Sequence, residues 1–145
     1  MYIGLLHLHN VLRWLILIVA LVVLFKYFTG WFGRKKWQRS DQIIGMVFTS
    51  LIDLQFLTGI ILYFVVSPIT KTAFQNFGAA MKNADLRFYV LEHAIMMLIA
   101  VVLIHIGWSG AKKARNDRSR YGRILIFFGL ALIIILASIP WTRVI

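Results

Sequence analysis

Four apolar runs, each long enough to cross a membrane, dominate the chain. They cover about residues 3–28, 43–66, 88–111 and 121–141. A helix needs about 20 apolar residues to cross the roughly 30 Å of hydrocarbon in a bilayer, and each run reaches that length. The runs make up most of the chain, and 61% of its 145 residues are hydrophobic. We therefore predict an all-α integral membrane protein, with residues 1–145 forming a single domain of four transmembrane helices.

The connections between the runs indicate how the helices are arranged. Those after the first and third runs are short, which favours an antiparallel up-down-up-down bundle. The longest connection follows the second run and contains Phe74, Phe77 and Met81. We expect a short helix lying on the membrane there, with Asp85 as the N-cap of the third run.

The formal net charge of +11 is concentrated in two connections. The first connection carries Arg34, Lys35, Lys36 and Arg39, and the third carries Lys112, Lys113, Arg115, Arg118, Arg120 and Arg123. In a four-span chain these connections share one face, which the positive-inside rule makes cytoplasmic. We therefore predict a multi-pass membrane protein with both termini on the outer side. Topology and contact with anionic lipids account for the basic residues, so no nucleic-acid partner is expected.

Several ionisable side chains lie inside the apolar runs, where they are costly and usually functional. They are Arg13, Asp53, Glu92, His93 and His105, with His7 and His9 near the outer end of the first run. At about 1.5 Å of rise per residue, His93 reaches the depth of the first-run histidines. Two neutral imidazoles at one level on different helices can ligate the iron of a b-type haem from opposite sides. The chain has no cysteine, which excludes thiolate metal sites and covalently attached haem.

Helix periodicity selects between the histidines. His7 and His9 lie about 200° apart around a helix, so both cannot face one iron. Arg13 must avoid lipid, and His9 lies on the same stripe, so His9 is the inward histidine. Two inward stripes are expected: His9, Arg13, Ile16 and Ala20 in the first run, and His93, Met97, Ala100, Ile104 and Gly107 in the third. We predict His9 and His93 as the ligands of one haem, with His7 and His105 as alternates.

The remaining buried charges have structural and functional interpretations. A buried Arg13 needs a carboxylate, and either Asp53 or Glu92 could supply one in an ion pair between helices. Alternatively, Glu92 could form a proton or quinone site beside the redox centre. His105 lies about 18 Å beyond His93, with no other histidine at its level, so it does not provide a second haem site. It is expected to make a polar contact or to bind a quinone headgroup.

Two further points concern the cofactor. Haem propionates usually face water, so Arg87, Lys82 or Lys71 suits them better than the deeper Arg13. Met96 and Met97 beside His93 would offer thioethers to Cu(I) as an alternative, although methionine is also a common packing residue.

The chain resembles small four-helix bacterial membrane proteins commonly labelled cytochrome b-like, in the segments LHLHNVLRW, LQFLTGIILYF, LRFYVLEHAIMMLIAVVLIHIGWS and LASIPW. The pattern His-Ser/Asn-x-x-Arg-aromatic matches His9, Asn10 and Arg13. Glu-His, followed twelve residues later by His-Ile-Gly, matches Glu92, His93 and His105. The resemblance implies haem b and membrane electron transfer. With it, the predicted location becomes the bacterial cytoplasmic membrane, and the outer side of the predicted topology becomes the periplasmic side.

These observations lead to one expected role and one rival. Because no soluble catalytic domain is expected, we predict an electron-transfer subunit between a quinone pool and another redox protein, such as a subunit of a respiratory complex, rather than a self-contained enzyme. The rival is a cofactor-free structural or accessory subunit of a larger membrane complex, whose polar residues serve helix association.

Overall fold

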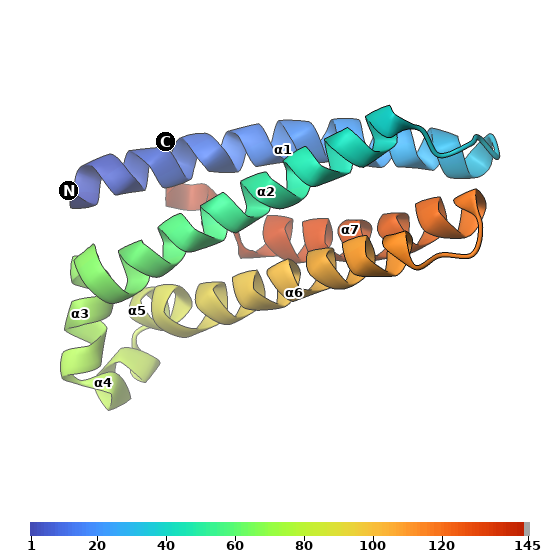
Figure 1. Cartoon of the computed structure of the whole chain (residues 1–145). Coiled ribbons are helices and arrows are strands. Elements are labelled where there is room, and N and C mark those ends of the chain that lie inside the picture. Colours follow the sequence, from blue (N-terminus) through green and yellow to red (C-terminus); the bar gives the residue numbers. More distant parts are fainter. Residues whose placement is uncertain (144–145) are drawn as a thin grey trace.

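The computed structural model describes residues 1–143, which are helical almost throughout (Figure 1). Helix α1 covers Tyr2–Phe32, and α2 covers Arg39–Ile61 and continues into a π-helical turn, η1, at Leu62–Val66. Three short helices follow, which are α3 (Pro68–Gln75), α4 (Phe77–Lys82) and α5 (Ala84–Arg87). The chain then forms a second π-helical turn, η2 (Phe88–Glu92), α6 (His93–Lys112), α7 (Asp117–Ser138) and a 3₁₀ turn, η3 (Trp141–Arg143).

Four of the described helices are long and apolar enough to cross a membrane. When η1 is counted with α2, and α5 and η2 are counted with α6, the four helices cover Tyr2–Phe32, Arg39–Val66, Ala84–Lys112 and Asp117–Ser138. The four predicted runs are thus confirmed as helices of sufficient length and hydropathy. The last helix ends at Ser138, earlier than the predicted boundary at residue 141. Ile139 is extended, with ψ of 130°, because the ring of Pro140 disfavours helical geometry in the residue before it.

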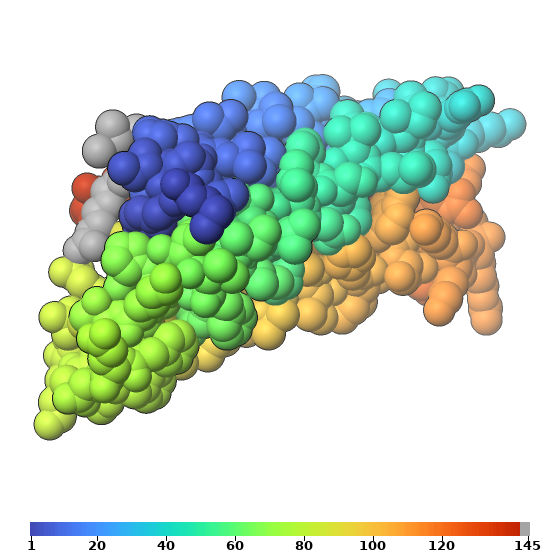
Figure 2. All heavy atoms as spheres, turned by 60° about the vertical axis from the view of Figure 1, so that its left-hand side comes forward, coloured from blue at the N-terminus to red at the C-terminus, as the bar shows by residue number. Residues whose placement is uncertain are grey.

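Figure 1 shows the long helices side by side along one axis. The α1–α2 and α6–α7 connections lie at one end, which we call the basic end. The N-terminus and the short helices α3–α5 lie at the other, which we call the histidine end. In Figure 2 the α3–α5 segment projects from the body there. Two short helices, α3 and α4, replace the one expected in this connection, since α5 continues through η2 into α6. The predicted cap is wrong: Asn83 Oδ1, not Asp85, accepts the first amides of α5, at 3.0 and 3.1 Å.

Apolar side chains fill the interior and also cover the outside of the long helices. The largest fully buried ones are Tyr27, Tyr121, Phe128, Ile104, Ile124 and Val23. The exposed ones include Phe25, Leu21, Ile126 and Ile133, each more than 60% accessible. A helix that is apolar all round belongs either in the core of a large protein or in lipid. The outer surface of this bundle therefore suits a hydrocarbon environment.

A buried carboxylate joins three helices at the basic end. Asp41, in the first turn of α2, is 3% exposed. Its Oδ2 accepts hydrogen bonds from Tyr121 Oη of α7 at 2.7 Å and from Gln38 N at 2.9 Å. Its Oδ1 lies 3.3 Å from Lys26 Nζ of α1, and its carbonyl accepts a bond from Tyr27 Oη at 2.7 Å. Burying this charge is tolerated because both carboxylate oxygens are paired.

The packing beside Asp41 generates the first prediction. A Cβ added at Gly45 would overlap the Trp108 ring and the Tyr27 hydroxyl, whereas a Cβ at Gly129 of α7 would meet nothing within 4 Å. Gly45→Ala should lower the free energy of unfolding by about 1–3 kcal/mol, because an overpacked core must shift. Gly129→Ala is the matched control and should raise it by about 0.5–1 kcal/mol through helix propensity. Thermal unfolding in detergent measures both, and equal effects of the two substitutions would contradict the packing.

Candidate functional site

Side chains from three helices form a polar cluster at the histidine end. We define this histidine cluster as His9 and Arg13 of α1, Gln55 of α2 and His93 of α6. Gln55 Nε2 donates to the carbonyl of His9 at 3.0 Å, and this bond ties α2 to α1. His93 Nδ1 lies 2.9 Å from the carbonyl oxygen of Ser138, the last residue of α7. All four long helices therefore contribute to the cluster.

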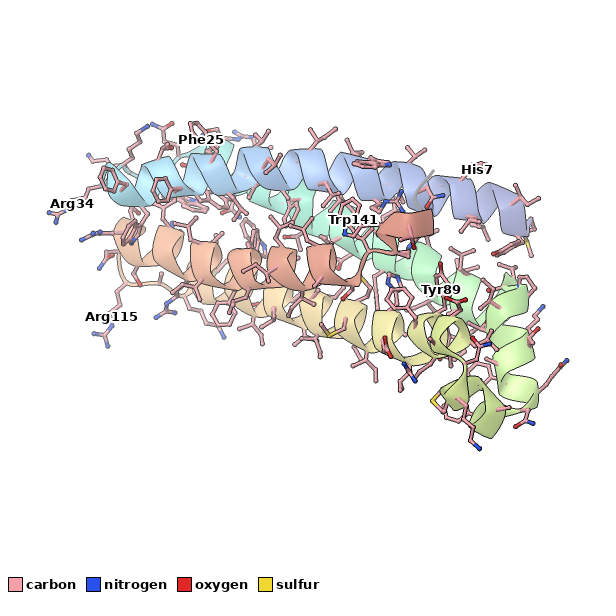
Figure 3. All side chains as sticks on the ribbon, turned by 180° about the vertical axis from the view of Figure 1, so that it is seen from behind. His7, Phe25, Arg34, Tyr89, Arg115 and Trp141 are labelled. Carbon is pink, nitrogen blue, oxygen red and sulfur yellow. The ribbon has the colours of Figure 1, made fainter. Side chains whose placement is uncertain are left out.

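Helix periodicity explains why His9 and His93 point inward. His9 and Arg13 are partly buried, and Ile16 and Ala20 continue their stripe of α1 into the core. His7 is exposed, and Figure 3 shows it on the outward side of α1. The inward orientation predicted for His9 is therefore what the structure has, and the alternate ligand His7 lies outside the cluster.

The predicted stripe of α6 also faces the interior. Below the partly buried His93, Ala100, Ile104 and Gly107 are buried and Met97 packs against the core. His9 also lies within electrostatic range of both His93 and Arg13. The same proximity holds between His93 and Arg13.

The cluster holds four buried polar atoms that lack a hydrogen-bond partner. They are His9 Nδ1, Arg13 Nε, Arg13 Nη2 and Gln55 Oε1, and among the described side chains of residues 1–142 such atoms occur nowhere else. Arg13 Nη1 donates only to Asn10 Oδ1, at 3.2 Å. An unpaired buried polar group costs about 1–3 kcal/mol, and more when it is charged. The concentration of all four in one cluster therefore points to a missing partner that carries polar or charged atoms.

Two π-helical turns lie next to the cluster. One, η2, ends at Glu92, directly before His93, and the other, η1, begins three residues after Gly59. A Cβ at Gly59 would lie 3.4 Å from His9 Cε1, so the glycine leaves room for the imidazole. Tyr63 of η1 joins the two turns by donating to the carbonyl of Val90 in η2, at 2.7 Å. π-Helical turns are rare and occur frequently at functional sites, so their position supports the histidine end as the candidate functional site.

The carboxylates expected to pair with Arg13 have other partners. Asp53 Oδ1 lies 2.6 Å from Nε2 of His105, and Glu92 Oε1 accepts a bond from Nε of Arg87 at 2.8 Å. The expectation that one of them neutralises Arg13 is therefore wrong. The positions of Asp53 and Glu92 on their helices turn both side chains toward the surface, where they are 50% and 47% exposed.

The Asp53–His105 pair lies outside the histidine cluster. Both side chains are about half exposed, and they bridge α2 and α6 on the outer surface of the bundle. Leu54, Val102 and Ile106 expose apolar side chains on the same two helices. A polar pair among residues that suit hydrocarbon is costly unless something covers it.

Sequence reasoning overlooked two partners in the cluster. Gln55 is a polar residue within an apolar run, and its polarity was the signal that could have identified it. The carbonyl of Ser138 carries no such signal, because a backbone group becomes an acceptor only once the end of α7 is placed beside α6.

The donor set limits what the cluster can hold. Within residues 1–143, no three side chains of the types His, Cys, Asp and Glu come together as metal ligands. The cluster itself offers two imidazoles, one from α1 and one from α6. Comparison with known proteins adds no constraint, because no family model, no curated protein and no solved structure matches the chain.

Proposed function

We propose that the chain spans a bacterial cytoplasmic membrane four times as an antiparallel bundle, with its basic end inside and both termini outside. The four long apolar helices and their apolar outer surface support insertion. The concentration of Lys and Arg in the α1–α2 and α6–α7 connections supports the orientation, since cytoplasmic loops carry an excess of basic residues.

We further propose that His9 and His93 are the axial ligands of one haem b. The position of the proton on the His93 ring supports this assignment. A carbonyl oxygen can only accept, so the 2.9 Å contact with Ser138 requires the proton on Nδ1 and leaves Nε2 of His93 with a free lone pair. Metal-ligating histidines characteristically donate their other ring N–H to a backbone carbonyl or carboxylate in this way.

The unpaired atoms carry the proposal. Arg13 has two buried N–H groups without an acceptor, and a haem propionate would supply the missing anion. This assigns Arg13 a larger part than its depth suggested, whereas Arg87 is held by Glu92 and by the carbonyl of Met81. A bound haem would supply reversible one-electron chemistry. The residues of this chain would hold it, orient its ligands and keep water away.

As its role, we propose that the protein transfers electrons between a quinone pool and another membrane redox protein, for example within a respiratory complex. The Asp53–His105 pair faces the lipid, where a quinone would arrive, and both side chains can exchange the protons that accompany quinone chemistry. Glu92, exposed and adjacent to His93, offers a second position for proton exchange. The resemblance to cytochrome b-like proteins agrees with this role.

The haem proposal predicts an absorption spectrum. Protein purified in detergent with adequate haem supply, oxidised and then reduced with dithionite, should show a low-spin b-type spectrum with about one haem per chain by pyridine haemochrome assay. His9→Ala and His93→Ala should each abolish the spectrum or convert it to high spin, because each removes an axial ligand.

His7→Ala is the matched control for this experiment. It lies on the same helix, two residues from His9, and its side chain is exposed, so the spectrum should not change. His105→Ala should also leave the haem in place. The absence of haem from well-folded protein would refute the proposal, and loss of haem in His7→Ala but not in His9→Ala would reassign the ligand.

The rival function, a cofactor-free accessory subunit of a larger complex, draws on the lipid-facing Asp53–His105 pair. A transmembrane helix of another subunit could cover this pair and hydrogen-bond with it. A colourless protein that co-purifies stoichiometrically with a large assembly would favour this function over electron transfer.

The orientation has its own test. Alkaline phosphatase, which is active only outside the cytoplasm, should be active when fused after Ile145. The same reporter fused after Asn116, in the α6–α7 connection, should be inactive, while a green fluorescent protein fused there should fluoresce. The reverse pattern would invert the proposed orientation but leave every residue contact unchanged.

A further inference from the structure

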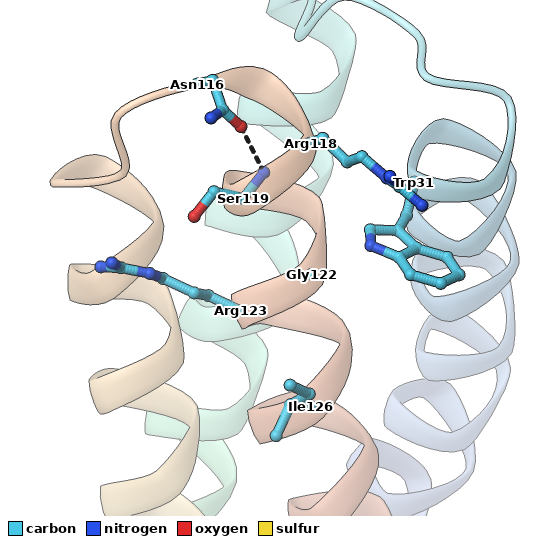
Figure 4. Close-up of a pocket in the computed structure, with 7 residues that line it drawn as sticks. All are labelled: Trp31, Asn116, Arg118, Ser119, Gly122, Arg123 and Ile126. Carbon is cyan, nitrogen blue, oxygen red and sulfur yellow. Dashed lines mark hydrogen bonds between the residues drawn. The ribbon is translucent and has the colours of Figure 1, made fainter.

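A hollow opens at the basic end, between the last turns of α1 and the first turns of α7 (Figure 4). Its volume is about 500 Å³. The side nearest the α6–α7 connection is polar and is formed by Asn116, Arg118 and Ser119. The side toward the middle of the bundle is apolar and is formed by Trp31, Gly122 and Ile126. A molecule that fits this hollow must itself have one charged or polar end and one apolar end.

Arg118 has the position and the unoccupied N–H donors that anion binding requires. Its guanidinium lies over the Trp31 ring, 5.0 Å from the ring centroid. A cation–π contact of this kind does not supply a hydrogen-bond acceptor to the N–H groups of the guanidinium. In the described part of the chain no hydrogen bond or ion pair occupies these donors, so they can form the paired N–H···O bonds that guanidinium makes with phosphate.

Ser119 and Asn116 lie beside these donors. Asn116 Oδ1 accepts the backbone N–H of Ser119 at 2.8 Å, which leaves the amide NH₂ of Asn116 and the hydroxyl of Ser119 as further donors. Arg123 also lines the hollow, but Figure 4 shows it extending to the other side of α7. There its Nη1 donates to the carbonyl of Gly110 at 3.1 Å. The anion contact therefore belongs to Arg118 rather than to Arg123.

The apolar side is shaped for a hydrocarbon chain. Gly122 has no side chain, and a Cβ there would lie 3.4 Å from the indole of Trp31, so the glycine keeps this part of the hollow open. One turn further along α7, Ile126 is 63% exposed and continues the apolar surface away from the basic end. A chain that follows this path from the phosphate would run toward the middle of the bundle, parallel to α7.

We propose that this hollow binds one anionic phospholipid, with its phosphate against Arg118 and Ser119 and an acyl chain along Gly122 and Ile126. The inference rests on the proposed membrane insertion and is independent of haem. Charge complementarity favours an anionic headgroup, because the α6–α7 connection and the first turns of α7 carry several arginines and the single acid Asp117. Basic pockets between transmembrane helices at the cytoplasmic face bind such lipids.

Native mass spectrometry of the full chain tests the proposal. The protein is reconstituted with mixed phosphatidylglycerol and phosphatidylethanolamine, released into mild detergent, and examined for lipid that remains bound. The wild type should retain one phosphatidylglycerol per chain. Arg118→Gln should reduce retention by about fivefold or more, because it removes the phosphate contact.

Two further variants separate specific binding from general attraction. Arg115→Gln removes the same charge three residues earlier, in the α6–α7 connection, but Figure 3 shows Arg115 pointing away from the bundle, so retention should change by no more than about twofold. Gly122→Leu keeps every charge but fills the apolar side, and it should also lose the lipid. If Arg118→Gln fails to give the wild-type circular dichroism spectrum, Gly122→Leu and Ser119→Ala provide the test.

Three outcomes would overturn the proposal. Equal loss in Arg115→Gln and Arg118→Gln would show diffuse electrostatic attraction, and equal retention of phosphatidylethanolamine would show that the anionic headgroup is not recognised. Displacement of the lipid by excess inorganic phosphate would show a phosphate site that needs no acyl chain. Failure of insertion itself is distinguishable, because the chain would then leave the membrane fraction in alkaline carbonate without detergent.

Discussion

A polar group surrounded by apolar helices must find its partner inside the bundle, and the two ends of this protein meet that requirement differently. At the basic end, both carboxylate oxygens of Asp41 are paired by groups from the chain itself. At the histidine end, the partly buried His9, Arg13 and Gln55 retain four buried side-chain atoms that have no hydrogen-bond partner. This contrast between a completed and an incomplete polar network is the observation on which the proposed ligand depends.

The geometry of the histidine end follows from the way α7 stops. Pro140 disfavours helical geometry at Ile139, so α7 ends at Ser138. The last carbonyls of a helix have no partner within the helix, and the Ser138 carbonyl finds one in His93 Nδ1 of α6. A local steric effect in one helix thereby sets the tautomer of a histidine in another. The proposed ligand atom, Nε2 of His93, is free as a consequence.

The length and hydropathy of the apolar runs were sufficient to predict the four helices. The 3.6-residue repeat within one helix was sufficient to predict the inward faces of His9 and His93. The partners of Arg13 could not be predicted in the same way. Which carboxylate lies near Arg13 depends on the rotation and depth of separate helices. In the structure Asp53 pairs with His105 and Glu92 pairs with Arg87. The π-helical turn η2 adds to the difficulty, since a wider turn directly before His93 changes the directions of the residues that precede it.

Helix α6 presents two histidines to two different environments. His93 and His105 are twelve residues apart, so they are rotated by about 120° relative to each other and separated by about 18 Å along the helix. His93 faces the incomplete polar cluster, while His105 faces outward with Asp53. The electron transfer that we propose would need both an enclosed redox centre at the cluster and a proton-exchanging group on the outer surface. Placing both on one rigid helix fixes their separation, so a partner docked at Asp53 would always meet the cluster at the same distance.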